Sequence, residues 1–255
     1  MIEKEALDFS ELISHHLADH TLHIQALGGL HLTKHMLVQS VAALLTAGAV
    51  FFAANSRGGL RTAIDGLVIF IRKEIVHPAL GSEDGDAYLP CLLTLFLFIF
   101  FQNVLGLFPG SATPTGNISV TATLSLCTFF LIHVAGMWRH GIVHHWKNMI
   151  PHGVPWPMIP LVFAIEVMGY VTKSLALCIR LFANMTAGHL VILLFLGLIL
   201  LFGQSNPWTG LVVAPISVGL ALGLYALELL VALIQAYVFT MLTAIFVGGA
   251  LHLAH

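Results

Sequence analysis

The chain has 255 residues, of which 58% are hydrophobic and 9% are charged, and its mean hydropathy is +0.94. This composition is typical of a protein that crosses a membrane several times, and it excludes a soluble globular protein. The formal net charge is −2, and no basic tract interleaved with aromatic residues points to a nucleic-acid partner. Three cysteines lie in apolar segments without metal-ligand spacing, so no disulfide framework is expected: Cys91, Cys127 and Cys178.

The first part of the chain predicts a polar arm, one span and one surface helix. Residues 1–35 mix acidic residues with six histidines and lack the pattern of a signal peptide, so we expect a retained, water-exposed arm. Residues 36–56 hold an apolar run long enough for the first transmembrane helix. In residues 57–80 apolar side chains form one stripe and charged ones lie away from it, which predicts an amphipathic helix in the plane of the interface. We expect the acidic segment 81–86 to be the turn that ends it.

The middle of the chain predicts a transmembrane helix pair and a loop. Residues 88–138 hold two apolar runs joined by an uncharged turn. Residues 139–160 are polar and contain four prolines, which favours a solvated interfacial loop. The alternative is a zinc site, because His140, His144 and His145 can share one helical face. We prefer the loop and assign no metal site.

Residues 161–202 are apolar and contain no proline, yet they carry ionisable side chains. A helix of this length extends for about 60 Å, roughly twice the hydrocarbon thickness of a bilayer, so we predict one long, tilted helix. Glu166, Lys173 and Arg180 recur every seven residues, which places them on one face. Ionisable groups at membrane depth are costly and face a cavity or a partner, so this stripe is the candidate site. Ion pairs that serve only packing are the alternative.

The next apolar stretch is also too long for one upright span, so residues 161–255 are expected to form a strongly tilted hairpin. The whole chain then reads as an all-α polytopic membrane protein with five membrane-crossing helices and one interfacial helix. Lysines and arginines gather after the first and third spans, whereas the turns 109–117 and 203–208 carry no charge. The positive-inside rule therefore places the 139–160 loop and the C-terminus in the cytoplasm and the N-terminal arm outside.

Helical rise predicts which side chains share a depth in this hairpin. If it turns at residue 206, Arg180 lies level with Gln235, and His189 lies level with Glu228. His189 and Glu228 can exchange protons near neutral pH. Arg180 stays charged, so its plausible role is to repel a passing proton and to lower the pKa of a carboxylate that a partner presents.

Two amides and one carboxylate complete this set. Gln235 and Asn184 equally fit a direct role or simple hydrogen bonding between helices. Glu166 lies some 20 Å from Arg180, on the side away from His189.

Two motifs, RLFANMTAGH at 180–189 and ELLVALIQAYVF at 228–239, resemble subunit a of the F-type ATP synthases. The likeness extends upstream through Glu166, Lys173 and the pairs Gln102-Asn103 and Phe108-Pro109, and it covers roughly residue 57 to the C-terminus. It implies that Arg180 is the stator charge that faces a carboxylate of the c-subunit ring. Gln235 then lies beside it, and Asn184 is grouped with them.

The resemblance also implies two half-channels. His189 and Glu228 match the pair that lines the outer half-channel, and Glu166 matches the acidic residue of the inner one, with which Lys173 is grouped. Many bacterial relatives carry the acid and the imidazole of the outer pair in the opposite order. This chain has the order of the mitochondrial type, which we interpret as a compensated exchange. The long N-terminal arm resembles the bacterial form, so we expect a bacterial plasma (inner) membrane and not the mitochondrial inner membrane.

The implied mechanism is rotary, with protons that load the ring carboxylate from outside and leave inside after almost a full turn. No glycine-rich phosphate-binding motif occurs, so ATP chemistry belongs to other subunits, and we expect neither catalytic residues nor a cofactor. The implied partners are the c-subunit ring, the peripheral-stalk b subunits, the remaining ATP synthase subunits and the lipid bilayer. The sequence leaves open whether the coupling ion is H⁺ or Na⁺.

Two other classes are the alternatives. A metal permease would use the histidines as ligands, but such folds usually show internal repeats and broken helices at the binding site. The two halves of this sequence show no repeat, and the predicted helix that holds Arg180 has no helix breaker. An intramembrane hydrolase is disfavoured because no Ser or Cys nucleophile can be paired with a placed histidine.

Overall fold

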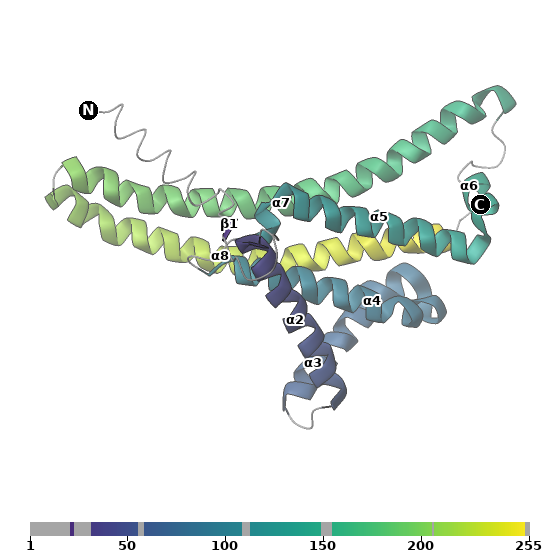
Figure 1. The fold of residues 1–255 in the computed structure, drawn as a ribbon, viewed down its shortest axis with the longest axis horizontal. Coiled ribbons are helices and arrows are strands. Elements are labelled where there is room, and N and C mark those ends of the chain that lie inside the picture. Colours follow the sequence, from purple (N-terminus) through teal and green to yellow (C-terminus); the bar gives the residue numbers. More distant parts are fainter. Residues whose placement is uncertain are drawn as a thin grey trace.

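The predicted hairpin is the longest feature of the computed structural model, which describes residues 21–22, 32–55, 59–108, 113–148, 155–205 and 207–252. Helix α7 runs from Ile159 to Ser205 and α8 from Pro207 to Leu251. Each is about 70 Å long at the helical rise of 1.5 Å per residue. The two helices run along the long axis of the molecule and lie side by side from the end at residue 206 to the middle of the molecule, whereas the first part of α7 diverges from α8 (Figure 1). Pro215 lies inside α8 and does not end it.

Five helical segments of the described chain are long and apolar enough to cross a membrane: Lys34–Phe52, Ile64–Gly106, Ile118–His140, Trp156–Gly203 and Trp208–Leu251. Large apolar side chains are exposed on these segments, among them Leu44, Phe130 and Ile216. Such a surface suits hydrocarbon and would be unfavourable in water. The prediction of an all-α polytopic membrane protein is therefore confirmed.

The N-terminal arm is described only in part. Strands β1 (Thr21–Leu22) and β2 (Leu32–Thr33) pair antiparallel, with Thr21 opposite Thr33. Residues 1–20 and 23–31 of the predicted arm lie outside the described residues. Helix α2 (Lys34–Asn55) then covers the predicted first span.

The segment after the first span differs from the prediction. Helix α3 (Gly59–Ile71) passes through a π-helical turn, η2 (Arg72–Val76), into helix α4 (His77–Gly106). The expected acidic turn at 81–86 is wrong, because the chain breaks at Gly81 alone, with φ of 79° and ψ of 176°. Glycine adopts this conformation readily. Glu83 and Asp84 lie in the first turn after the break, where the helix dipole stabilises carboxylates, so helix forms at once.

The third span is helix α5 (Ile118–His140), which follows a short 3₁₀ turn, η3 (Pro114–Gly116). Its N-terminus is capped by Asn117, whose side chain accepts a hydrogen bond from the backbone N–H of Ser119 at 2.9 Å. Gly141, with φ of 81°, ends α5 and directs the chain into helix α6 (Ile142–Asn148). After η4 (Trp156–Met158) the chain enters α7. The predicted loop thus contains a short helix, and one side chain of that helix, His145, is buried.

The end of α8 contacts the segment of α4 that contains the break at Gly81. A Cβ at Gly248 would overlap the carbonyl group of Ala79, so only glycine permits this approach. His252 Nε2 lies 3.0 Å from the Leu80 carbonyl oxygen, and the Asp84 carboxylate lies 3.5 Å from His252 Nε2 and 3.6 Å from an Arg139 nitrogen. Three elements, α4, α5 and α8, therefore meet at one end of the molecule. We call this the terminal end, and we call the end at residue 206 the hairpin end.

Candidate functional site

His189 on α7 is held by groups from three other segments. Its Nδ1 lies 3.1 Å from Glu228 Oε1 on α8, and its Nε2 lies 3.0 Å from the carbonyl oxygen of Gly106. That carbonyl is free because α4 ends at Gly106, and the last carbonyls of a helix lack partners within the helix. Thr113 Oγ1 lies 3.0 Å from His189 Nε2 and donates to the same carbonyl at 3.2 Å.

These contacts assign the protons of the pair. A carbonyl oxygen only accepts, so the Nε2 that faces Gly106 carries a proton. Nδ1 faces a carboxyl oxygen, and two lone pairs would repel each other there, so one further proton lies between His189 and Glu228. It belongs either to an imidazolium–carboxylate pair or to an imidazole–carboxylic acid pair. The site thus binds one exchangeable proton where α7 meets α8.

Gly188 makes room for this pair. A Cβ at residue 188 would overlap the Glu228 carboxyl group, so any larger residue would displace that group. Glu228 is buried, and its Oε2 has no hydrogen-bond partner among the described residues. The second carboxyl oxygen therefore keeps its capacity to accept a hydrogen bond.

Arg180 lies further along α7, towards the terminal end. Its side chain is exposed, and within the described chain it forms neither an ion pair nor a hydrogen bond. One turn beyond it, Asn184 donates from Nδ2 to Gln235 Oε1 on α8 at 2.9 Å. The predicted match in depth is confirmed by contact for His189 and Glu228. Gln235 was predicted to lie level with Arg180, and it contacts Asn184, which lies one helical turn beyond Arg180.

The other two members of the predicted stripe do not pair with Arg180. Lys173 places its Nζ 4.8 Å from the ring centroid of Tyr170 and 5.2 Å from that of Phe246 on α8, which is a cation–π arrangement. Glu166 is partly buried. The described residues contain no ion pair between any two of Glu166, Lys173 and Arg180. Ion pairing that serves only packing is therefore not what holds this stripe.

Polar atoms without protein partners gather near the His189 pair. They are buried side-chain atoms on α4, η3, α7 and α8, and within the described chain they lack hydrogen bonds: Gln102 Nε2 and Oε1, Asn103 Oδ1, Thr115 Oγ1, Thr186 Oγ1 and Gln235 Nε2. Buried polar groups are normally satisfied, by water where protein atoms do not serve. This set is therefore suited to line a hydrated path.

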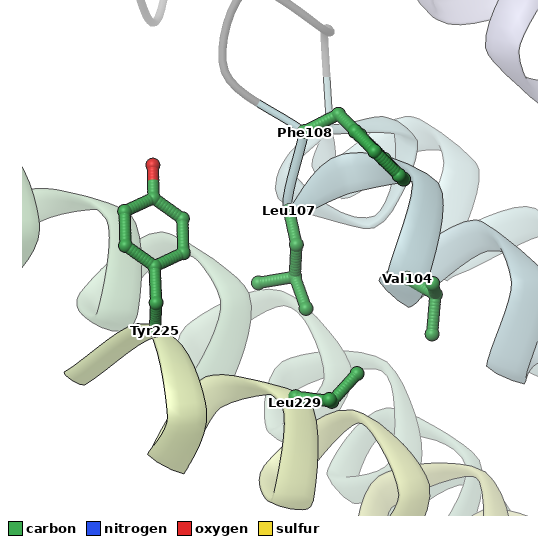
Figure 2. A pocket seen from close by; sticks show the side chains of 5 residues that line it. All are labelled: Val104, Leu107, Phe108, Tyr225 and Leu229. Atoms are coloured by element: carbon green, nitrogen blue, oxygen red, sulfur yellow. The ribbon is translucent and has the colours of Figure 1, made fainter. Parts of the chain in front are cut away.

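An apolar recess lies between the end of α4 and α8. It has a volume of about 550 Å³ and is lined by Val104, Leu107, Phe108, Tyr225 and Leu229. Figure 2 shows the Leu107 side chain reaching from the end of α4 towards α8, between Tyr225 and Leu229. Its lining suits hydrocarbon and offers little to a hydrated ion. The polar atoms on α4 and η3 are thus the better candidates for an aqueous approach to Glu228.

The three histidines of the 139–160 segment that the structure describes do not converge. His140 Nε2 donates to the Leu251 carbonyl oxygen at 2.9 Å, and His144 is exposed. His145 points inwards, where its Nε2 lies 3.2 Å from Nδ1 of His133 on α5. In the described residues no group of three or more metal-ligating side chains could hold a metal ion. The zinc alternative therefore has no support from the geometry.

Sequence reasoning missed two features of this region. Thr113 and Gly106 lie in or beside an uncharged turn, and nothing in their own sequence indicates contact with a histidine some eighty residues away. His133 lies inside an apolar span, and an ionisable residue at membrane depth is a functional candidate by default. That signal was available in the sequence.

The described chain is a polytopic α-helical membrane protein whose two longest helices carry an acid–imidazole pair and an unpaired arginine. Comparison with known proteins gives its family. The family model described as "ATP synthase A chain" matches residues 35–248. The chain therefore belongs to the ATP synthase subunit a family.

Individual relatives agree with this family. The ATP synthase subunit a of Myxococcus xanthus (strain DK1622) is 42% identical over 233 residues, which is 89% of this chain and 75% of that protein. That of Anaeromyxobacter sp. (strain Fw109-5) is 41% identical over 224 residues, 85% of this chain and 53% of that protein. That of Chloroherpeton thalassium (strain ATCC 35110 / GB-78) is 39% identical over 231 residues, 86% of this chain and 66% of that protein. The chain thus spans between about half and three quarters of the length of these relatives.

Proposed function

We propose that this chain is the stator subunit in the membrane sector of a rotary F-type ATP synthase. It provides two offset half-channels that carry protons to and from a carboxylate on each subunit of the c-ring. Proton flow through them turns the ring, and partner subunits make ATP. The other partners are the peripheral-stalk b subunits, the remaining synthase subunits and the lipid bilayer.

The observation that carries this proposal is the state of Arg180. A guanidinium is charged at any physiological pH, and a charge at membrane depth needs a partner. The described chain supplies none, although Arg180 lies in the middle of an apolar helix and its side chain is exposed. Its counter-charge is therefore expected on another chain, and a ring carboxylate fits. The positive charge of Arg180 lowers the pKa of that carboxylate. The carboxylate therefore releases its proton beside Arg180 and stays deprotonated while it passes the arginine.

The His189–Glu228 pair serves the outer half-channel. It binds one exchangeable proton, as the contacts of Nδ1 and Nε2 require. A proton that arrives past the buried amides of α4 binds to Glu228 Oε2. The proton shared by Glu228 and His189 then moves on towards the c-ring. Because Nε2 remains bonded to the Gly106 carbonyl, the ring of His189 keeps its orientation throughout.

The inner half-channel opens at the terminal end. Glu166 lies fourteen residues before Arg180 on α7, about 20 Å along the helix. A proton released at Arg180 leaves past this carboxylate, with Lys173 beside it on the same face. In a bacterial plasma membrane the terminal end is then cytoplasmic and the N-terminal arm is outside, as the positive-inside rule requires.

The test is ATP-driven acidification of inverted membrane vesicles that carry the whole complex with Arg180→Ala. We expect pumping to be lost while immunoblots show normal assembly. Arg61→Ala is the matched control, because Arg61 is also exposed but is paired with Asp65 at 3.5 Å, outside the hairpin. That variant should pump normally. Normal pumping by Arg180→Ala would refute the proposed function.

A further inference from the structure

A second pair of ionisable side chains lies buried at the terminal end. His133 Nδ1 on α5 lies 3.2 Å from His145 Nε2 on α6, and the two side chains are 6% and 1% exposed. One of the facing nitrogens carries the proton of this hydrogen bond and the other accepts it. The two outward nitrogens, His133 Nε2 and His145 Nδ1, are buried and have no hydrogen-bond partner among the described residues.

The pair lies in an aromatic cage. The His133 ring centroid lies 4.3 Å from that of Phe129, 5.3 Å from that of Tyr170 on α7, and 5.5 Å from that of Trp146, with which the ring is stacked. Gly136 leaves the space that the His145 ring fills, because a Cβ there would overlap that ring. Apolar side chains would fill the same cage without leaving two polar atoms unpaired. Packing alone thus gives no reason for two imidazoles here.

The cage borders the inner part of α7. Tyr170 contacts His133, lies one turn beyond Glu166, and supports the Lys173 ammonium on its ring. Tyr170 therefore links the pair to the segment of α7 that carries Glu166, to which the proposed function assigns proton release. No comparable pair exists elsewhere in the described chain on this side of Arg180.

We propose that His133 and His145 form a proton-binding site of the inner half-channel, which takes up a proton next to Glu166 and passes it towards the cytoplasm. This inference rests on the proposed function and extends its inner path beyond Glu166. The proton adds to one outward ring nitrogen and makes an N–H bond. The product is an imidazolium hydrogen-bonded to a neutral imidazole, and release of the same proton restores the neutral pair.

The ionisable groups around the pair influence the pH at which it binds a proton. The titratable groups around it are His140 on α5, His144 on α6, Tyr170 with Glu166 and Lys173 on α7, and His252 beyond Ala250 on α8. Burial, and then the charge of His140, lower the pKa of His145 below its ordinary value of 6.5. A lowered pKa keeps His145 neutral at pH above 6.5, which suits a relay that binds a proton transiently.

The experiment uses the assembled complex in inverted vesicles and variants that keep the hydrogen bond but cannot bind a proton. The Asn amide can take the place of His Nδ1 and the Gln amide that of His Nε2, so the variants are His133→Asn, His145→Gln and the double variant. His144→Gln is the matched control on α6, because His144 is exposed. Proton flux is measured from pH 5.5 to 8, together with Arg180→Ala.

We expect a several-fold loss of flux in the three variants and a change in the shape of their pH profile, whereas His144→Gln matches wild type. Wild-type flux and profile, or lower flux with an unchanged profile, would overturn the inference, since the pair would then only support α6. If the double variant does not assemble, the single variants are judged by the same criterion. A failure of this inference can be told apart from a failure of the proposed function, because only in the second case would Arg180→Ala pump normally.

Discussion

Two pairs of ionisable side chains in the described residues lie between packed helices, and they differ in how their protons are bound: His189 with Glu228, the outer pair, and His133 with His145, the inner pair. In the outer pair an imidazole meets a carboxyl, and the remaining ring nitrogen of His189 is bonded to the Gly106 carbonyl. In the inner pair an imidazole meets an imidazole, and both remaining nitrogens are unpaired within the described chain. In the outer pair the contacts therefore require one proton between its members. In the inner pair the facing nitrogens share one proton, and a further proton would give the pair a charge.

The two sites therefore favour opposite states in the proposed path: the outer one favours the proton-bound state and the inner one the proton-free state. An acid and a base in contact stabilise the shared proton whichever partner holds it. Two bases in an apolar cage have no negative partner, so the charged form is disfavoured. A path that loads a carrier and then unloads it needs both behaviours, the first on the loading side and the second on the release side.

The largest effect should come from removal of the outer acid. Glu228→Gln leaves His189 bonded to Gly106 but takes away the group that shares the proton. We expect ATP-driven pumping to fall by about 100-fold or more, the range for loss of a group that transfers protons. The exchange His189→Glu with Glu228→His restores both chemical groups at one depth and should recover part of the activity. Normal pumping by Glu228→Gln would show that the pair is structural.

A smaller loss should follow from crowding the same pair. Gly188→Ala places a methyl group where the Glu228 carboxyl lies, so the hydrogen bond to His189 is displaced. We expect pumping to fall by about tenfold, since misplacement of a reacting group by roughly 1 Å costs at least that much. Gly169→Ala on the same helix is the control, because no atom lies within 4 Å of a Cβ there. Equal activity of the two variants would contradict the assigned geometry.

The smallest effect should be the pH dependence of the inner pair. His145 has a pKa lowered by burial, so the folded state binds its proton less readily than the unfolded state does. Its neutral form stabilises the docking of α6 at pH above 6.5, and this contribution is lost as the pH falls below 6.5 towards the lowered pKa. The protection of the amides of residues 142–148 against hydrogen exchange, expressed relative to the intrinsic exchange rate at each pH, should therefore be lower at pH 5.5 than at pH 7.5. In His145→Gln the pH-dependent part should vanish; its persistence would assign it to another group.

Much of the fold was predictable because the bilayer imposes simple rules. Runs of about twenty apolar residues predict spans, and the excess length of 161–202 predicts a long, continuous helix, which α7 is. The contact between His189 and Glu228 follows from helical rise on the two arms of one hairpin. The acidic segment 81–86 was misjudged because turn chemistry was given more weight than the preference of carboxylates for a helix N-terminus.

The candidate site, like the fold, has a part that the sequence predicts and a part that it does not. Composition predicts which ionisable groups enter the membrane, and the regular rise of a helix predicts that an acid and an imidazole share a depth on α7 and α8. The packing of the helices brings the end of α4 to His189, where its carbonyl fixes the proton on Nε2. The same packing turns His145 away from His144 into a cage with His133. Both contacts join segments whose approach is set by packing between helices, and no local pattern encodes that approach.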